Sequence, residues 1–417
     1  MIKKILLLIP QNVIPATDGG KIGIFKPMQK LAAEFNVKAM VFVDQEEKAN
    51  AQPYSKINVD VTFLAVSKKD TFLSAIFNIG NKMPFKFQKY YLEQHKLFIE
   101  KTCNNWKPDA IICHHAHLAN YCRDIKRKFP AILLLLREHN VEYLLVEQYC
   151  KHQRNLILRQ FAYWQFQKTK RFERRSWDYF DNVIFISDSD FKHHTVDSIS
   201  KAQIIYDGTD NIAEYIEVPE EKINAFLFSG SLRSYQNQIN LHHFVHNIWI
   251  PWKKNYQGSF GYELWVTGDK DTQFVQQQLG LNKSEVNEYK IQLLGFVDDI
   301  VVVMTKAKFF LSPTIIGAGI RIKVLQAMGL GCVVFLTQKD LDISVEFKHS
   351  QNVILYEDTA SFNKNFELLS TIPNPLYVKI AARAALCAKE HFTWDIFYNK
   401  LKTLINVVNS GTENHNN

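Results

Sequence analysis

Two glycines followed by two basic residues form the stretch of this sequence that is best suited to bind a charged ligand. Gly317 and Gly319 precede Arg321 and Lys323, and all four follow the apolar run 309–311. A helix that opens after such a loop presents unpaired backbone N–H groups, and its dipole adds partial positive charge at the same end. Phosphate is the group that such a site binds, and the two cations would add to the attraction.

The residues around this loop predict the structural unit that positions it. The apolar runs 309–311 and 333–336 have the character of buried strands, and residues 320–328 repeat apolar side chains at helical spacing. Gly329 and Gly331 would end the helix. The sequence therefore predicts a strand, a loop, a helix and a second strand. An ordinary βαβ unit with solvated charges is the alternative that these residues leave open.

The string that spans this unit, P-x-x-x-G-x-G-I-R-I-K-V-L-x-A-M-x-x-G from Pro313, resembles the donor-binding segment of glycosyltransferase family 4. That family contains retaining enzymes with the GT-B fold. The resemblance implies that Gly319, Arg321, Lys323 and Gln326 bind the nucleoside diphosphate sugar that serves as donor.

Two positions depart from the family pattern. Many members carry two glutamates with seven residues between them, and here the same positions are Ala318 and Gln326. The second glutamate typically accepts hydrogen bonds from the donor ribose. Because a neutral acceptor binds less strongly than a charged one, glutamine there would weaken donor binding by about 1 kcal/mol, or roughly fivefold.

A second pair of glycines lies near the start of the chain. The apolar run 5–9 predicts a buried strand, and the loop 11–20 after it ends in Gly19 and Gly20 before a helical segment. Without a Cβ, these residues let a diphosphate or a sugar approach the backbone. This opening resembles the start of family 4 enzymes, although a plain turn explains the glycines equally well.

Polar residues follow the predicted strand 132–136 in the order R-E-H-N-V-E. The carboxyl end of a buried parallel strand is where α/β sheets bind ligands. The string also resembles family 4, in which the histidine commonly faces the transferred sugar, and the resemblance gives that role to His139. A histidine that bonds to loop carbonyls is the alternative.

A further loop follows the strand predicted at 226–228. Family 4 often places an arginine and a lysine here for the diphosphate, and the resemblance gives Arg233 this role. Asn237 stands at the lysine position. Earlier, residues 204–210 resemble the crossover between the two domains of the family, with Asp207 in place of the usual asparagine.

Three histidines, His114, His115 and His117, lie at the end of the strand predicted at 110–113. No carboxylate or thiolate stands at a convincing spacing from them, so no metal site is predicted. The H-H-x-x-H string that begins at His242 lacks the glutamate of a metalloprotease and is interpreted as a helix face. The D-x-D at 188–190 follows a strand and is likewise not assigned to a metal.

Length and composition predict two domains. The chain has 417 residues, of which 47% are hydrophobic, enough for two cores. The resemblance implies the GT-B arrangement, with two doubly wound Rossmann-like domains that face each other across a cleft. We expect an N-terminal, acceptor-side domain at 1–208, a donor-side domain at 209–392, a helix at 393–409 that crosses back to the first domain, and a disordered tail at 410–417.

The net charge of +8 favours anionic partners. Nucleotides and anionic lipid headgroups are predicted, and nucleic acid is not, because no binding motif accompanies the charge. Two basic stretches rich in aromatic residues, 68–91 and 151–175, are either solvated helix faces or membrane-surface patches.

The compartment is predicted from the cysteines and from the start of the chain. Six cysteines without a C-x-x-C pair indicate reduced thiols in the cytoplasm. The apolar start is too short for a signal peptide, and no window has the length of a membrane span. We expect a cytoplasmic protein, peripheral on the inner face of the membrane if the basic patches bind lipid.

The function expected from the resemblance is that of a metal-independent, retaining hexosyltransferase that needs no cofactor. The sugar would pass from a nucleoside diphosphate sugar to a glycan or lipid-linked acceptor in cell-envelope, capsule or exopolysaccharide synthesis. The alternative is a non-catalytic GT-B protein that binds a sugar nucleotide or a partner glycosyltransferase. Gln326 and the missing lysine favour that alternative, and binding of a donor without turnover would identify it.

Overall fold

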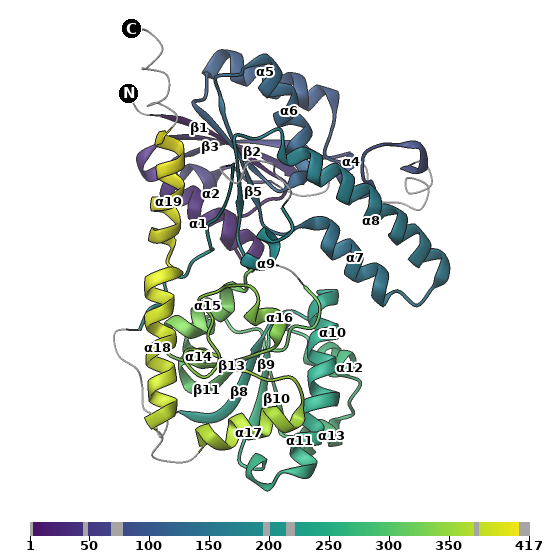
Figure 1. The fold of residues 1–417 in the computed structure, drawn as a ribbon, viewed down its shortest axis with the longest axis vertical. Coiled ribbons are helices and arrows are strands. Elements are labelled where there is room, and N and C mark those ends of the chain that lie inside the picture. The colour runs from purple at the N-terminus through teal and green to yellow at the C-terminus, as the bar shows by residue number, and fades with distance from the viewer. Residues whose placement is uncertain are drawn as a thin grey trace. The chain divides into compact units, whose positions relative to one another are not determined.

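The chain folds into two compact units in the computed structural model (Figure 1). The structure describes residues 3–44, 49–67, 78–194, 201–213, 222–317, 319–370 and 375–407. Unit 1 comprises Met1–Tyr206 together with Trp394–Asn417, and unit 2 comprises Asp207–Thr393. Each unit is an α/β sandwich, and each is described here by itself.

The described residues of unit 1 form a seven-stranded parallel sheet in the order β3-β2-β1-β4-β5-β6-β7. The chain starts in the middle of this sheet and winds outward in both directions, so its crossover helices cover both faces. The strands between them are apolar and buried, as parallel strands must be. The strands are β1 (Lys4–Ile9), β2 (Asn36–Val43), β3 (Val59–Ala65), β4 (Ala110–His114), β5 (Leu133–Glu138), β6 (Asn182–Phe185) and β7 (Ala202–Ile204).

Two long helices of unit 1 begin at a side chain that caps them. The Asp18 carboxylate accepts a hydrogen bond from the Lys21 N–H at the start of α1, and Asn155 caps α8 in the same way. The helical segments are α1 (Gly19–Glu34), α2 (Gln52–Ser55), η1 (Asn78–Gly80), α4 (Phe85–Gln88), α5 (Glu93–Trp106), η2 (Ala116–Leu118), α6 (Ala119–Lys128), α7 (Glu142–His152), α8 (Leu156–Trp177), α9 (Asp188–Phe191) and α19 (Trp394–Val407).

The described residues of unit 2 form a six-stranded parallel sheet in the order β10-β9-β8-β11-β12-β13. The strand order reverses between β8 and β11, and ligands of open α/β sheets bind outside the carboxyl ends of the strands at such a point. The strands are β8 (Ile223–Ser229), β9 (Glu263–Thr267), β10 (Ile291–Gly295), β11 (Ala307–Ser312), β12 (Val333–Leu336) and β13 (Ile354–Leu355).

An aromatic core holds the helices of unit 2 against this sheet. Phe226 of β8 stacks on Phe309 of β11 with 4.6 Å between the ring centroids, and both contact Phe335 of β12. The helical segments are α10 (Tyr235–Phe244), η5 (Val245–Trp249), α11 (Ile250–Asn255), η6 (Gln257–Ser259), α12 (Thr272–Leu279), α13 (Lys283–Glu288), α14 (Ile300–Lys306), α15 (Ile322–Gly329), α16 (Gln338–Leu341), α17 (Thr359–Ser370) and α18 (Pro375–His391).

The fold class expected from the sequence is confirmed. Every run predicted as a strand overlaps a strand of the structure, and both sheets have the doubly wound order. The units divide after Tyr206 and after Thr393, whereas the predicted boundaries came after residues 208 and 392. The last helix belongs to unit 1, and residues 410–417 lie outside the described residues.

The first basic stretch is only partly described. Residues 68–77, with two of its five lysines and two of its six aromatic residues, lie outside the described residues. In the remainder, Phe87 is buried against His117 and Phe172, and Phe85 packs on Phe161. These rings serve the packing of unit 1 and are not exposed to a membrane. Among the described residues, no helix has both the length and the hydrophobicity to cross a membrane.

Candidate functional site

The loops at the carboxyl ends of β8 and β11 meet at the point where the strand order of unit 2 reverses. Lys323, at the second position of α15, donates a hydrogen bond of 2.9 Å to Ser229 Oγ at the end of β8. The side chain therefore crosses from the β11 side of the sheet to β8. This places a cation in the region where doubly wound sheets bind phosphates.

The glycine loop before α15 is held by a buried asparagine. Asn240 of α10 accepts hydrogen bonds from the Ile315 and Ile316 N–H groups at 3.0 and 2.9 Å, and it donates to the Ile316 carbonyl at 2.9 Å. Gly317 and Gly319 have φ angles of +138° and +71°, which L side chains rarely adopt. Asn240 thus holds the start of the loop, and the backbone at positions 317 and 319 needs glycine.

The helix predicted over 320–328 begins only at Ile322, and Arg321 is its N-cap, with an extended backbone, instead of a residue of its first turn. Its Nε is 3.8 Å from the Asp340 carboxylate, and its guanidinium occupies the space that a Cβ at Gly317 would need. Burial raises the pKa of Asp340, and Arg321 acts in the opposite direction. The Arg321 side chain therefore packs against the glycine loop and Asp340.

Gln326 does not lie alone on its helix. Its Nε2 donates a hydrogen bond of 3.2 Å to Asn211 Oδ1, and Asn211 approaches so closely that a Cβ at Gly329 would lie 2.0 Å from its carbonyl oxygen. The side chain expected at the donor ribose thus has a partner within unit 2. Ala318, the other departure from the family pattern, lies outside the described residues.

Arg233 lies on the opposite side of β8 from Lys323. Its Nε is 3.6 Å from the Asp269 carboxylate, its guanidinium lies 4.9 Å from the centroid of the Phe274 ring, and its side chain is 69% exposed. Asn237, at the position of the family's lysine, donates to the Ser231 carbonyl at 2.9 Å. Arg233 is therefore the one of these two positions that offers a positive charge.

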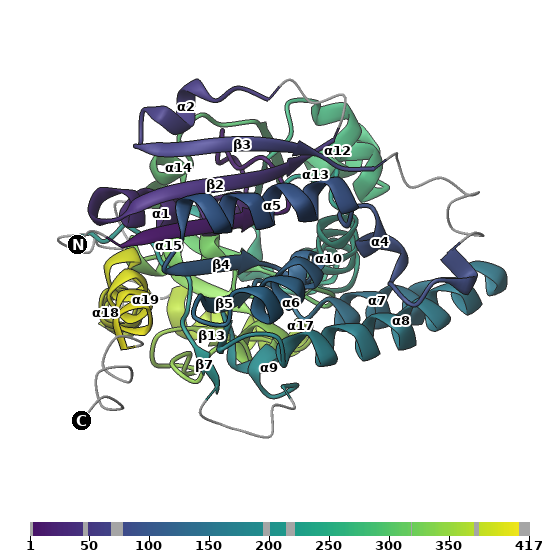
Figure 2. The same cartoon turned by 90° about the horizontal axis from the view of Figure 1, so that it is seen from above.

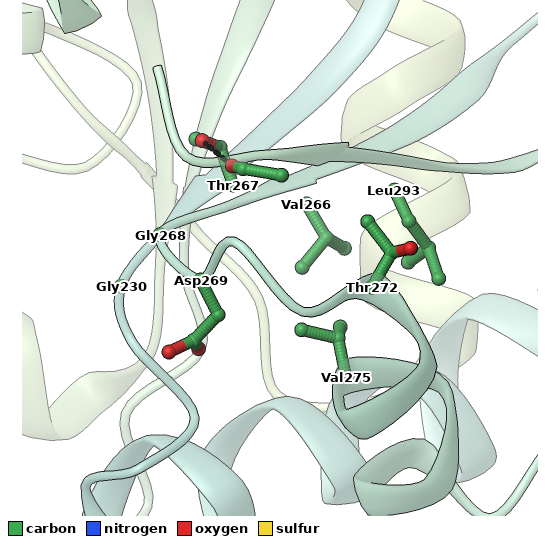
Figure 3. A pocket seen from close by; sticks show the side chains of 9 residues that line it. Gly230, Val266, Thr267, Gly268, Asp269, Thr272, Val275 and Leu293 are labelled. Atoms are coloured by element: carbon green, nitrogen blue, oxygen red, sulfur yellow. Dashed lines mark hydrogen bonds between the residues drawn. The ribbon is translucent and has the colours of Figure 1, made fainter. Parts of the chain in front are cut away.

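The loops after β8, β9 and β10 pack closely around a small hollow that leaves no room for a water molecule (Figure 3). Asp269 shapes its edge, because its carboxylate accepts hydrogen bonds from Ser231 Oγ at 2.7 Å and from the Leu232 N–H at 2.6 Å. A Cβ at Gly268 would lie 2.6 Å from the Gly230 backbone. The lining residues are Gly230, Val266, Thr267, Gly268, Asp269, Thr272, Val275, Leu293 and Gly295.

The paired glycines of unit 1 form the first turn of α1 and not a loop before it. Neither has a positive φ, and a Cβ at Gly20 would meet only the Asp18 carboxylate oxygen at 3.4 Å and the Gln11 amide nitrogen at 3.7 Å. The backbone of unit 1 therefore does not require glycine at position 20. The resemblance implies that Gly19 and Gly20 leave space for a ligand beside the backbone, and this role stays a prediction.

His139 lies at the end of β5 in a cluster of imidazoles. Its Nε2 is 3.0 Å from His114 Nδ1, and its ring stacks on that of His115 with 4.5 Å between centroids. The side chain is only 4% exposed. Burial, with the nearby Arg137, His115 and His114, lowers the pKa of His139 well below its usual value, so the imidazole is neutral at pH 7. A neutral ring can position a hydroxyl but carries no charge.

Buried carboxyl groups lie beside this cluster. Burial raises the pKa of Glu138 to about 8, although its Oε1 accepts a hydrogen bond of 3.0 Å from the Trp177 indole. Glu173 accepts hydrogen bonds from the Glu142 and Tyr143 N–H groups at 2.8 and 2.9 Å, which fixes the first turn of α7. Sequence reasoning identified neither role, since Glu173 contacts residues about 30 positions earlier.

Arg137, the first residue of the R-E-H-N string, has a structural role. It is 1% exposed, donates a hydrogen bond to the Gly23 carbonyl of α1, and lies with its guanidinium 4.4 Å from the centroid of the Phe397 ring of α19. Arg137 thereby joins β5 to the first and last helices of unit 1. The string thus contains a structural residue, Arg137, and a residue assigned to the site, His139.

A comparison with protein families finds a similarity in unit 2. Residues 223–370 match the model of the family described as Glycosyl transferases group 1. This part of unit 2 is therefore similar in sequence to group 1 glycosyltransferases. Lys323, Arg321 and Arg233 all lie inside the matched residues, in agreement with the resemblance to family 4 found from the motifs. No protein of curated function is similar enough in sequence to count as a match.

Solved structures extend the likeness to the whole chain. Sucrose-phosphate synthase from Thermosynechococcus elongatus is 14% identical, covering 98% of this chain and 100% of its own, with a TM-score of 0.69. A glycosyltransferase from Rickettsia africae is 13% identical over 98% of both chains, with a TM-score of 0.66. HepE of Anabaena in complex with UDP is 14% identical over 96% of this chain and 99% of its own, with a TM-score of 0.65. The chain has the GT-B fold.

Proposed function

We propose that this protein is a retaining glycosyltransferase that transfers a sugar from a nucleoside diphosphate sugar to an acceptor hydroxyl. The observation that carries the proposal is Lys323 bonded across the switch point of a unit that is similar in sequence to group 1 glycosyltransferases. In the reaction, the bond between the sugar C1 and the diphosphate oxygen breaks, and a bond from C1 to the acceptor oxygen forms on the same face. The hydroxyl proton leaves with the diphosphate product.

The cations of unit 2 would stabilise the leaving group. Negative charge builds on the diphosphate as the C1–O bond breaks, and fixed positive groups lower the free energy of that state. Lys323 and Arg321 stand at the start of α15, and Arg233 adds a third charge after β8. These residues make the reaction independent of a metal at the diphosphate. His139 is assigned to the transferred sugar, which it would orient by a hydrogen bond.

A uridine nucleotide is the first donor to test. HepE of Anabaena, which shares the fold, is seen with UDP and with UDP-glucose. We therefore propose UDP-hexoses before GDP- and ADP-hexoses.

An acceptor carried at a membrane would suit a feature of unit 1. Helices α7 and α8 form a pair whose connecting end, residues 151–159, lies away from the sheet of the unit (Figures 1 and 2). We call this end the hairpin tip. Leu156 and Ile157 there are 69% and 81% exposed, next to the exposed cations Lys151, Arg154 and Arg159. Apolar side chains flanked by basic residues bind anionic lipid surfaces. We propose a peripheral enzyme of envelope, capsule or exopolysaccharide synthesis on the cytoplasmic face.

Release of nucleoside diphosphate tests the transfer. Purified protein is incubated with a panel of UDP-, GDP- and ADP-hexoses and with lipid or glycan extracts as acceptors, and the anomeric configuration of the product is determined by NMR. The proposal expects acceptor-dependent release and an α-linked product from an α-linked donor. Donor binding without turnover on every extract would favour the non-catalytic alternative. Inversion at C1 would contradict the retaining mechanism.

A further inference from the structure

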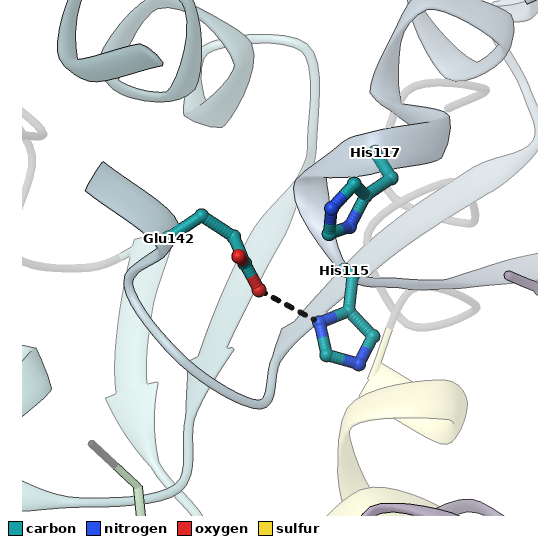
Figure 4. A group of neighbouring side chains, drawn as sticks. All are labelled: His115, His117 and Glu142. Atoms are coloured by element: carbon teal, nitrogen blue, oxygen red, sulfur yellow. Dashed lines mark ion pairs between the residues drawn. The ribbon is translucent and has the colours of Figure 1, made fainter. Parts of the chain in front are cut away.

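Two histidines and a glutamate of unit 1 converge at the carboxyl ends of β4 and β5 (Figure 4). His115 and His117 follow β4, and Glu142 is the first residue of α7. One potential ligand atom from each lies within 4.8 Å of the other two, and His115 Nδ1 is 3.5 Å from Glu142 Oε1. The sequence analysis excluded a metal here because no carboxylate stood near the histidines, and the fold supplies Glu142 from the next βα connection.

One ring nitrogen of each histidine lacks a hydrogen-bond partner, although that of His115 faces the Glu142 carboxylate at 3.5 Å. The Nδ1 atoms of His115 and His117 are both buried and make no hydrogen bond within the described residues. A buried polar atom without a partner is rare and costs about 1–3 kcal/mol. Two such atoms on one side of a carboxylate are explained if all three groups bind the same ion.

The backbone holds the three side chains in place from separate directions. The His115 N–H donates to the Arg137 carbonyl at 3.0 Å, and its φ of +66° is a conformation that costs a residue other than glycine about 1–3 kcal/mol. His117 packs its ring on Phe87, with 4.2 Å between centroids. Glu173 holds the N–H of Glu142 at 2.8 Å. The group is therefore positioned by the fold and does not depend on the ion for its assembly.

We propose that His115, His117 and Glu142 bind a divalent transition-metal ion, with zinc as the first candidate. Two imidazoles and one carboxylate form a known three-residue zinc set, which leaves the fourth position to water or a ligand oxygen. In tetrahedral zinc, neighbouring ligand atoms lie about 3.4 Å apart. The observed 3.5 Å between His115 and Glu142 already matches this spacing, and the remaining separations, up to 4.8 Å, require small rotations of the rings.

The charges around the group set the affinity. Lys86 and Lys89 act electrostatically on His117 and oppose a cation, whereas Glu142 is the anion that attracts one. Binding therefore depends on the coordinate bonds and not on a general negative potential. An exposed acidic patch would bind ions without selectivity, and this group would select imidazole-binding metals over Mg²⁺ or Ca²⁺.

Metal titration of the full chain, free of any affinity tag, tests the proposal. Protein stripped with a chelator is titrated with Zn²⁺ by calorimetry, and with Co²⁺ while the visible absorption of tetrahedral cobalt is recorded. We expect one ion per chain, tetrahedral bands, and no comparable binding of Mg²⁺. Wild type that binds no stoichiometric Zn²⁺ would overturn the proposal whatever the variants do.

Three variants assign the ligands. Glu142→Gln keeps the size of the side chain and His117→Ala removes one ring, and each should weaken Zn²⁺ binding more than about 100-fold, since even changes behind the ligands cost about 10–100-fold. His242→Ala is the control, because it disrupts another histidine pair, His242 of α10 and His246 of η5, whose rings lie 4.3 Å apart. Binding that is lost in His242→Ala and kept in Glu142→Gln would place the ion elsewhere. The readout uses the metal alone, so it is independent of glycosyl transfer.

Discussion

His139 shows how closely a single residue of the candidate site is packed. It is 4% exposed, and the imidazoles of His114 and His115 contact it on two sides. Because it is assigned to the sugar and not to the diphosphate, His139→Ala should lower turnover at least about tenfold and change the affinity for nucleoside diphosphate less than about twofold. Steady-state kinetics and calorimetry on the same preparation measure the two effects.

A control separates this role from the cost of removing any buried histidine. His95, also in unit 1, is 6% exposed and contacts the Ala65 carbonyl at 2.8 Å. His95→Ala should destabilise unit 1 without changing turnover per folded molecule. The assignment of His139 fails if its alanine variant keeps the wild-type rate and loses donor affinity.

Glu138 predicts a pH dependence of stability. Burial raises its pKa from 4.5 to about 8, so between these values the folded state binds more protons than the unfolded state. Its contribution to stability is therefore present at low pH and is lost as the pH rises through this window. In Glu138→Gln, the amide oxygen can still accept the hydrogen bond from Trp177. The free energy of unfolding of this variant, relative to that of the wild type, should rise by more than about 1 kcal/mol from pH 5 to pH 8. Urea unfolding of both proteins at pH 5 and at pH 8 measures this change. The same stability difference between variant and wild type at the two pH values would refute the prediction.

The elements of the fold were largely predictable, and several of their contacts were not. Apolar runs with turn residues between them indicated the strands of both sheets, because buried parallel strands leave a continuous signal. The residues that hold the candidate site were missed for a physical reason. Asn240 bonds to a residue 76 positions away, and Asp269 to one 37 positions away. Such contacts depend on which strands become neighbours, and local spacing does not contain that information.

The loop before α15 supports a prediction at the scale of elements. Asn240→Leu would remove three hydrogen bonds and leave the N–H groups of Ile315 and Ile316 unpaired in a buried place. Each unpaired group costs about 1–3 kcal/mol, so the loop should lose its defined path and nucleotide binding should weaken at least about tenfold. Asn247→Leu, on an exposed turn of the next helical segment, is the control. Calorimetry on both variants decides whether the loop must be held for binding.

The hairpin tip supports a prediction for the whole molecule. At low salt the protein should float with vesicles that contain anionic lipid and should be released by salt, because each basic residue near such a surface contributes about 1 kcal/mol. Lys168 contributes little to this attraction, since it is bonded to the Asn78 carbonyl at 2.7 Å, and the exposed cations Arg154 and Arg159 contribute more.

Variants of exposed leucine and isoleucine locate the binding surface. Ile157→Asp should abolish flotation, whereas Leu386→Asp, at a side chain of unit 2 that is 51% exposed, should leave it unchanged. Protein that stays in solution with anionic vesicles at low salt would remove the membrane part of the proposed function and leave the transfer reaction untouched.

The identity of the donor-binding surface is the claim on which the proposed function depends most. Sequence motifs indicated Lys323, and the structure adds its contact with Ser229 and the partner of Gln326, Asn211. A carboxylate at position 326 would accept more strongly from a ribose and could also pair with Lys323, so Gln326→Glu should improve donor binding only a few-fold.

Calorimetric titration of wild type and Lys323→Ala with UDP, GDP and ADP tests this claim most directly. Loss of a charge-assisted contact to the diphosphate costs about 1.5–3 kcal/mol, so Lys323→Ala should weaken the preferred nucleotide by about 10- to 100-fold or more. Lys364→Ala, at an exposed lysine of α17, should bind as wild type does. A Lys323→Ala protein that binds every nucleotide with wild-type affinity would contradict the account, because α15 would then be a structural helix and not part of a donor site.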